Sequence, residues 1–177
     1  VVGFKELLCP TQYTHENAYN GNDYASIREM TIRHNCEIIY NSLPDSLRPI
    51  FKKWEIIVAN GNSSTNSSGN TGTQVINDYL AAPAYKEIFG VNSSNHSDEG
   101  ELLTQLAYYS AESNRIKKYN GEDMDWFLRT PNNYFYYKAG YYAYIVNKTG
   151  SASSKLTGYQ NDDMYCAYSY LSPIGCI

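Results

Sequence analysis

The chain has 177 residues and a mass of 20.1 kDa, the size of one ordinary domain, so we expect a single domain over residues 1–177. Its net charge of −4 excludes the broad positive field that binding to a nucleic-acid backbone requires. No apolar run reaches the ~20 residues that cross a bilayer, and we expect no insertion into a membrane. Because the first residue is valine, we expect the chain to be the C-terminal part of a longer protein.

Two helices are expected near the N-terminus. Apolar residues recur at helical spacing from about Tyr24 to Ser42, which predicts the first helix. A short second helix is expected to begin at Pro44, because proline and aspartate suit a first helical turn.

The middle of the chain is predicted to alternate between short elements and polar loops. Residues 54–58 are β-branched and aromatic and predict a strand, whereas residues 60–72 contain no apolar side chain and predict a mobile loop. A short strand at 78–81, a short helix at 83–89 with a glycine cap, and a helix at about 99–109 are expected next.

From Trp126 onward the sequence predicts short strands. Residues 142–147 and 151–158 flank a glycine-containing turn and are expected to form a β-hairpin, and 174–177 are expected to form a closing strand. Two N-terminal helices followed by a mostly antiparallel, twisted C-terminal sheet make an α+β fold.

Histidine is the first candidate for acid–base chemistry, and the chain has three: His15, His34 and His96. We interpret them as surface or capping residues, because no catalytic, nucleotide-binding or zinc-binding motif accompanies them. The acidic clusters at 122–125 and 161–163 lack the spacing of a calcium-binding loop and are interpreted as solvated carboxylates. We therefore expect no enzyme activity, no catalytic residue, no metal site and no cofactor.

The four cysteines, Cys9, Cys36, Cys166 and Cys176, are too widely spaced for a zinc knuckle or a small disulfide scaffold. We interpret them mainly as small buried apolar residues. A bridge between Cys9 and Cys36, or between Cys166 and Cys176, is the alternative in an extracellular protein.

Tyrosine is the outlier of the composition. Ten of the 19 tyrosines fall between Asn132 and Tyr170, interleaved with Asn, Asp, Ser and Gly and with no Arg, His or Glu. Antibody binding surfaces have this composition, because tyrosine gives rigid contact area and the small polar residues give adaptable hydrogen bonds. The alternative is a sheet whose tyrosines pack internally, but the adjacent pairs 136–137 and 141–142 break strict alternation, so one member of each faces outward in a strand. The candidate ligand-binding residues are Asn132, Asn133, Tyr134, Tyr136, Tyr137, Tyr141, Tyr142, Tyr159, Asn161, Asp162, Asp163, Tyr165, Tyr168 and Tyr170.

Short motifs in and around this region carry a family resemblance. They are Trp126-Phe127-Leu128-Arg129-Thr130-Pro131, then Tyr144-Ile145-Val146-Asn147-Lys148-Thr149-Gly150-Ser151, and finally Pro173-Ile174-Gly175-Cys176-Ile177. The chain resembles a family of bacterial and phage domains with the pattern W-[WF]-L-R-[ST]-P, then A-Y-x-V-N-x-x-G-x and a G-V-x-P-A ending. That family is similar to C-type lectin-fold domains, including the variable proteins that retroelements diversify.

The resemblance implies a C-type lectin-like fold that displays a Tyr/Asn/Ser-rich variable surface to a protein or cell-surface ligand. It also implies an extracellular location, on a bacterial cell surface or on a virion such as a phage tail, and it is compatible with an oligomer. The residues expected to anchor the scaffold and fill the core are Trp126, Leu128, Arg129, Pro131, Ile145, Val146 and Ile174.

Our leading hypothesis is therefore a non-enzymatic ligand- or receptor-binding domain. One alternative is a calcium-dependent carbohydrate-binding adhesin module, in which tyrosine rings stack on sugars and Asp162 or Asp163 binds calcium. Another alternative is a structural domain of a surface or tail protein. The formylglycine-generating oxidases share the implied fold but need a reactive cysteine pair, and we do not favour that activity because Cys176 falls in the expected last strand.

Overall fold

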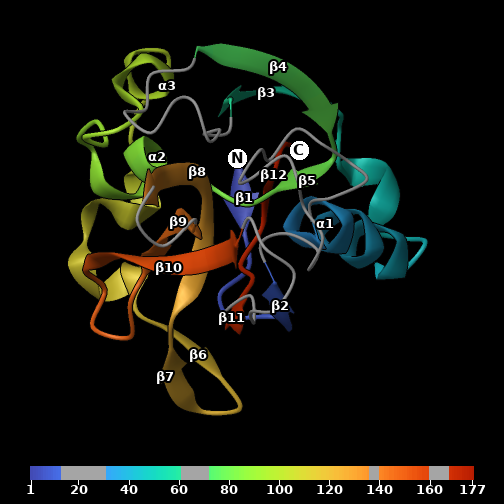
Figure 1. Cartoon of the computed structure of the whole chain (residues 1–177). Coiled ribbons are helices and arrows are strands. Elements are labelled where there is room, and N and C mark those ends of the chain that lie inside the picture. Colours follow the sequence, from blue (N-terminus) through green and yellow to red (C-terminus); the bar gives the residue numbers. More distant parts are fainter. Residues whose placement is uncertain (13–30, 61–71, 136–139, 160–167) are drawn as a thin grey trace.

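The computed structural model describes residues 1–12, 31–60, 72–135, 140–159 and 168–177 (Figure 1). In chain order the elements are β1 (Val2–Gly3), β2 (Pro10–Gln12), α1 (Thr31–Ser42), the 3-10 turn η1 (Arg48–Ile50), β3 (Trp54–Ala59), β4 (Thr73–Asp78), β5 (Leu80–Ala81), α2 (Tyr85–Phe89), α3 (Ser97–Glu101), the 3-10 turns η2 (Ala107–Ser110) and η3 (Glu112–Arg115), β6 (Lys117–Tyr119), β7 (Glu122–Met124), β8 (Trp126–Phe135), β9 (Gly140–Val146), β10 (Ala152–Tyr159), β11 (Tyr168–Tyr170) and β12 (Ile174–Gly175).

The predicted α+β, C-type lectin-like fold with two N-terminal helices is wrong. Strands in four small sheets dominate the described residues, and the α-helices there have 12, 5 and 5 residues. The described part of the expected first helix is α1, and residues 24–30 lie outside the described ranges. In place of the second helix there is one 3-10 turn, η1, which contains Pro49 and buries none of its residues. Without a buried apolar face a short helix gains no tertiary stabilisation, and helical propensity alone does not form it.

Other local predictions had mixed outcomes. The strand at 54–58 is confirmed as β3, and the hairpin is confirmed as β9 and β10, which pair antiparallel with Ala152 opposite Val146. The short helix closed by glycine is confirmed as α2, whose cap Gly90 has a φ of 76°, a left-handed conformation that glycine adopts without strain. The helix expected at 99–109 is wrong, because α3 ends at Glu101 and a 3-10 turn, η2, begins at Ala107. The predicted loop at 60–72 falls almost wholly outside the described residues.

A five-stranded sheet forms the centre of the molecule, with the strand order β10-β9-β8-β11-β2 (Figure 1). Strands β8 and β9 are antiparallel, and two register shifts in β8 make it longer than its partner. Side chains of successive residues point to opposite faces of a strand, so β8 contributes to two cores. Phe127 packs with Ile145 and with apolar residues of α1, β3 and β4, whereas Trp126 and Leu128 pack with Val146 and with residues of α2 and η2. Both faces of the sheet are therefore buried at this level.

The two ends of the chain lie side by side (Figure 1). Val2 is opposite Gly175 and Gly3 opposite Ile174, so β1 and β12 pair in a three-stranded sheet with β5. The side chain of Lys117 donates to the carbonyl oxygens of Phe4, at 2.5 Å, and Lys5, at 3.3 Å, which fixes the segment that follows β1. Within the described ranges we find no helix with the length and apolar character needed to cross a bilayer.

The scaffold residues predicted from the motifs are confirmed as core residues. Trp126, Leu128 and Arg129 have no exposed surface, and Ile145, Val146 and Ile174 are buried as well. Cys36 is buried in the core that contains Phe127 and Ile145, as expected of a small apolar residue, and it forms no disulfide with Cys9. Burial raises the pKa of the Cys9 thiol. Cys166 lies outside the described residues.

Candidate functional site

Three predicted contact residues share one end of the central sheet, which we call the tyrosine-rich sheet end: Tyr134, Tyr141 and Tyr159. Tyr134 of β8 is opposite Tyr141 of β9. Tyr159 of β10 is opposite Gly140, the residue before Tyr141, so the three backbone positions lie on adjacent strands. The connections between β8 and β9 and between β10 and β11 begin at this same end.

The other predicted contact residues include six that lie outside the described ranges, and some for which only the backbone is described. Tyr136, Tyr137, Asn161, Asp162, Asp163 and Tyr165 fall in the two connections, outside the described residues. For Asn133, as for the three tyrosines of the sheet end and Tyr168, only the backbone position is described.

Tyr168 and Tyr170 are not part of the tyrosine-rich sheet end. They lie in β11, where Tyr168 is opposite Gln12 and Tyr170 pairs with both Pro10 and Trp126. Trp126 begins β8 and Tyr134 lies near the other end of that strand, which at ~3.3 Å per residue separates them by about 20 Å or more. The ring of Tyr170 is half-buried, with its centroid 4.7 Å from that of Tyr119. We infer that Tyr170 has a packing role.

Two further candidates, Asn132 and Tyr142, are half-buried beside the sheet end. The Nδ2 of Asn95 donates to the Oδ1 of Asn132 at 2.5 Å, which ties β8 to the loop before α3. Tyr142 is opposite Leu156 of β10. Ala143, the next residue away from the sheet end, is fully buried, so the candidate surface ends at Tyr142.

A buried polar cluster, which we call the Arg129 cluster, is built around β8. It comprises Arg129 and Thr130 of that strand together with Glu87 and Glu99. The guanidinium Nη1 of Arg129 is 2.6 Å from Glu87 Oε2, and its Nε is 4.0 Å from Glu99 Oε1. Its Nε also donates to the carbonyl of Ile57 and its Nη1 to that of Ala82. The Oγ1 of Thr130 lies 2.5 Å from Glu99 Oε2. The cluster joins α2, α3 and β8.

The Arg129 cluster holds two carboxylates against one guanidinium. Burial raises the pKa of Glu99 to about 7, although Arg129, the Thr130 hydroxyl and the backbone N–H of Ala59 each favour the ionised form. Sequence reasoning missed both glutamates. The available signal was an arginine within the apolar run W-F-L-R-T-P, because a buried guanidinium requires acidic partners.

The histidines divide between surface and core. His34 is exposed, as expected, and His15 lies outside the described residues. His96 is the N-cap residue of α3, but its ring is fully buried instead of lying on the surface, and burial lowers its pKa to about 4. The ring is therefore neutral at physiological pH.

The acidic residues before β8 are engaged in ion pairs. Asp123 pairs with Lys118 at 2.7 Å and Asp125 with Lys155 at 2.9 Å. Among the described residues, no group of three or more His, Cys, Asp or Glu side chains is arranged to hold a metal ion. The first pair joins β6 to β7, and the second joins the residue before β8 to β10. The aspartates of 161–163 lie outside the described ranges.

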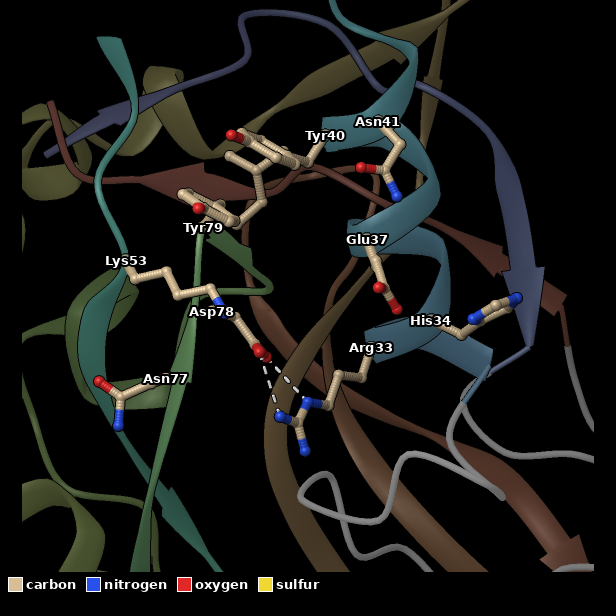
Figure 2. Close-up of a pocket in the computed structure, with 10 residues that line it drawn as sticks. Arg33, His34, Glu37, Tyr40, Asn41, Lys53, Asn77, Asp78 and Tyr79 are labelled. Atoms are coloured by element: carbon tan, nitrogen blue, oxygen red, sulfur yellow. Dashed lines mark hydrogen bonds and ion pairs between the residues drawn. The ribbon is translucent and has the colours of Figure 1, made fainter. Parts of the chain in front are cut away.

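A pocket of about 320 Å³ lies between α1, the residue before β3, and the turn that joins β4 to β5 (Figure 2). The side chains of Arg33, Glu37, Tyr40, Lys53, Asp78 and Tyr79 contribute to its lining. No sequence motif indicated this pocket, because its residues come from three segments that meet only in the folded chain.

Comparison with known proteins identifies a family but no activity. One family model, described as a domain of unknown function (DUF6273), matches residues 11–169, which is most of the chain. No curated protein matches the chain, and neither does any solved structure.

Proposed function

The chain belongs to the DUF6273 family, and we propose that it is a non-enzymatic ligand-binding domain whose contact surface is the tyrosine-rich sheet end. The observation that carries this proposal is the strand register, which sets Tyr134 of β8 directly opposite Tyr141 of β9. Tyrosines gathered on adjacent strands supply a large contact area with few rotatable bonds, so their ordering on binding costs little entropy.

The region behind the sheet end supports a binding role because many contacts hold it in place. Asn132 lies two residues before Tyr134 and is hydrogen bonded to Asn95. Arg129 and Thr130 precede it in the same strand and are fully buried in the Arg129 cluster. A contact surface on such a strand loses less freedom on binding than one on an unsupported loop.

The chemistry of the region favours a protein or another cell-surface molecule as the ligand. The stretch from Asn132 to Tyr170 combines tyrosine with Asn, Asp and Ser and contains no arginine, which suits mixed apolar and hydrogen-bonded contacts and not a phosphate backbone. By the sequence resemblance, we propose that the ligand is met outside the cell, on a bacterial surface or by a virion.

The test uses the purified domain, labelled with a fluorophore, on arrays of bacterial surface proteins and of glycans. The Tyr134→Ser/Tyr141→Ser double variant is compared with a Tyr108→Ser control, which removes a tyrosine that is 52% exposed and lies in η2. We expect the double variant to fold, as judged by circular dichroism, and to lose the binding that the control keeps. Retained binding, or a double variant that does not fold, would contradict the proposal.

Repeating the array in the presence of a calcium chelator separates the proposal from the carbohydrate-binding adhesin. Binding that persists with the chelator supports a tyrosine-based surface, whereas complete loss of binding favours the adhesin. Diversification by a retroelement is tested in the coding DNA. It requires a near-copy of the segment for residues 132–177 that differs at adenines and lies beside a reverse transcriptase gene.

A further inference from the structure

A second candidate site is the pocket between α1 and the β4–β5 turn. We propose that it binds a small zwitterion of the amino-acid class, a molecule that carries one carboxylate and one ammonium group. The site is separate from the tyrosine-rich sheet end, and it shares no residue with it.

Opposite charges face each other across the pocket. Glu37 lies in α1, and Lys53 is the residue before β3. Figure 2 shows their side chains entering the pocket from opposite sides. Both residues are exposed, and neither forms an ion pair with another described residue. The pocket therefore offers one cation and one anion that no ion pair among the described residues neutralises.

A paired guanidinium and carboxylate also line the pocket. Arg33 donates from Nε to Asp78 Oδ2 at 2.8 Å and from Nη2 to Oδ1 at 3.1 Å, a two-bond contact that holds both groups in fixed positions (Figure 2). The two charges cancel, so Glu37 and Lys53 set the polarity of the space. With one of each sign, the pocket as a whole is neutral, and a ligand of large net charge of either sign would leave one wall unmatched.

An aromatic surface completes the pocket. The rings of Tyr40 and Tyr79 stack with centroids 4.0 Å apart and planes 1° from parallel. The Nζ of Lys53 lies 5.4 Å from the centroid of Tyr79, which holds the cation beside the ring. The stacked pair provides apolar contact for the carbon skeleton of a bound molecule.

Size and charge together define the ligand class. At about 320 Å³ the pocket is at the lower end of the range for small-molecule sites, which suits a single amino acid. Its carboxylate would pair with Lys53 and its ammonium with Glu37. Blocking either group of the ligand would leave one charge of the protein facing an uncharged group, so the site discriminates against singly charged analogues.

The test is isothermal titration calorimetry with individual free L-amino acids as the probes. Each is compared with its N-acetylated form, which lacks the ammonium group, and with its amide, which lacks the carboxylate. We expect at least one free amino acid to bind at millimolar concentration or below, and both blocked forms to bind about tenfold or more weakly. Absence of binding by every amino acid, or equal binding of a blocked form, would overturn the proposal.

Variants of Lys53 and Glu37, which we call the wall variants, locate the site. Lys53→Met and Glu37→Gln are each expected to weaken binding about tenfold, and the Lys53→Glu/Glu37→Lys exchange is expected to restore it, because a zwitterion binds in the reverse orientation. The matched controls are Lys52→Met and Glu55→Gln, which change exposed neighbours outside the pocket lining. Unchanged affinity in both wall variants would overturn the proposal. The Tyr134→Ser/Tyr141→Ser variant should bind the amino acid normally, so failure of one proposal is distinguishable from failure of the other.

Discussion

The guanidinium of Arg129 and the carboxylate of Glu87 meet inside the protein, with Nη1 2.6 Å from Oε2, no exposed surface on the arginine side chain and 6% on the glutamate. The contact links β8 to α2 across a sequence separation of 42 residues. It therefore connects the strand that leads to the tyrosine-rich sheet end with the helix that packs against that strand. Because the arginine is fully buried and the glutamate nearly so, each depends on the other for neutralisation.

Replacing the arginine of this pair should destabilise the protein strongly. Arg129→Met removes the only cation that the described residues place against Glu87 and Glu99, and it leaves the carbonyl oxygens of Ile57 and Ala82 without their donor. Breaking one side of a buried ion pair costs about 3–5 kcal/mol. Urea denaturation should show this loss in the free energy of unfolding. The control is Arg48→Met, which breaks a surface pair with Asp45 and should change the free energy of unfolding little.

Glu99 should make stability depend on pH in the range below neutrality. Its pKa is raised to about 7 in the folded protein from an ordinary value of 4.5, so the folded state binds a proton that the unfolded state has released. The contribution of this group to stability is thus fully present below pH 4.5 and is lost as the pH rises through 7. Replacing Glu99 by glutamine keeps an acceptor for the N–H of Ala59 and removes the titration.

Above pH 7 the Glu99→Gln variant should therefore be more stable than the natural chain, by an amount on the order of 3 kcal/mol, and near pH 4 the difference should vanish. The measurement is the free energy of unfolding of both proteins across this pH range. Glu101→Gln is the control, because it changes an exposed glutamate of the same helix, α3, and should leave the pH profile unchanged. A constant difference between the Glu99→Gln variant and the natural chain at all pH values would refute the assignment.

Local patterns in the sequence predicted part of this architecture. The strand at 54–58 was predicted from its β-branched and aromatic composition, a rule that needs no knowledge of partners. The glycine cap of α2 and the β9–β10 hairpin follow from equally local rules. The expected second helix failed because its segment has no buried face, a property that depends on what the rest of the chain leaves uncovered.

The residue groups of the candidate sites also differ in whether a local sequence pattern indicates them. The contact role of the tyrosine-rich sheet end was predicted from composition and stays a prediction; its three tyrosines lie close together because β8, β9 and β10 are consecutive in the chain. Glu87 and Glu99 reach Arg129 only through tertiary packing, and Lys53, Glu37 and Asp78 meet only in the folded chain. Such long-range groupings leave no periodic or spacing signal in a single sequence.

The buried side chain of Lys117 should hold the N-terminal segment in place. Its Nζ donates to the carbonyls of Phe4 and Lys5, and burial lowers its pKa to about 8. Lys117→Met leaves both carbonyls without this donor, which costs about 1–2 kcal/mol locally. Hydrogen exchange at the Phe4 amide, which donates to Pro173, should then become about tenfold faster. Lys118→Met is the control, because this exposed lysine pairs with Asp123 on the surface, and equal exchange in both variants would contradict the role of Lys117.

Tyr170 and Tyr141 were predicted as members of one contact surface, but they lie at different ends of the sheet. Substitution of Tyr170 should mainly lower stability, whereas substitution of Tyr141 should mainly weaken ligand binding. The half-buried ring of Tyr170 packs on Tyr119, so Tyr170→Ala should lower the free energy of unfolding by an amount on the order of 2 kcal/mol and leave ligand affinity unchanged. Tyr141→Ser should weaken ligand binding by about tenfold or more with a smaller loss of stability. Urea denaturation and array binding of the two variants together check this division. Equal loss of binding in both would place β11 within the contact surface, because a packing role for Tyr170 predicts no effect on binding in a variant that still folds.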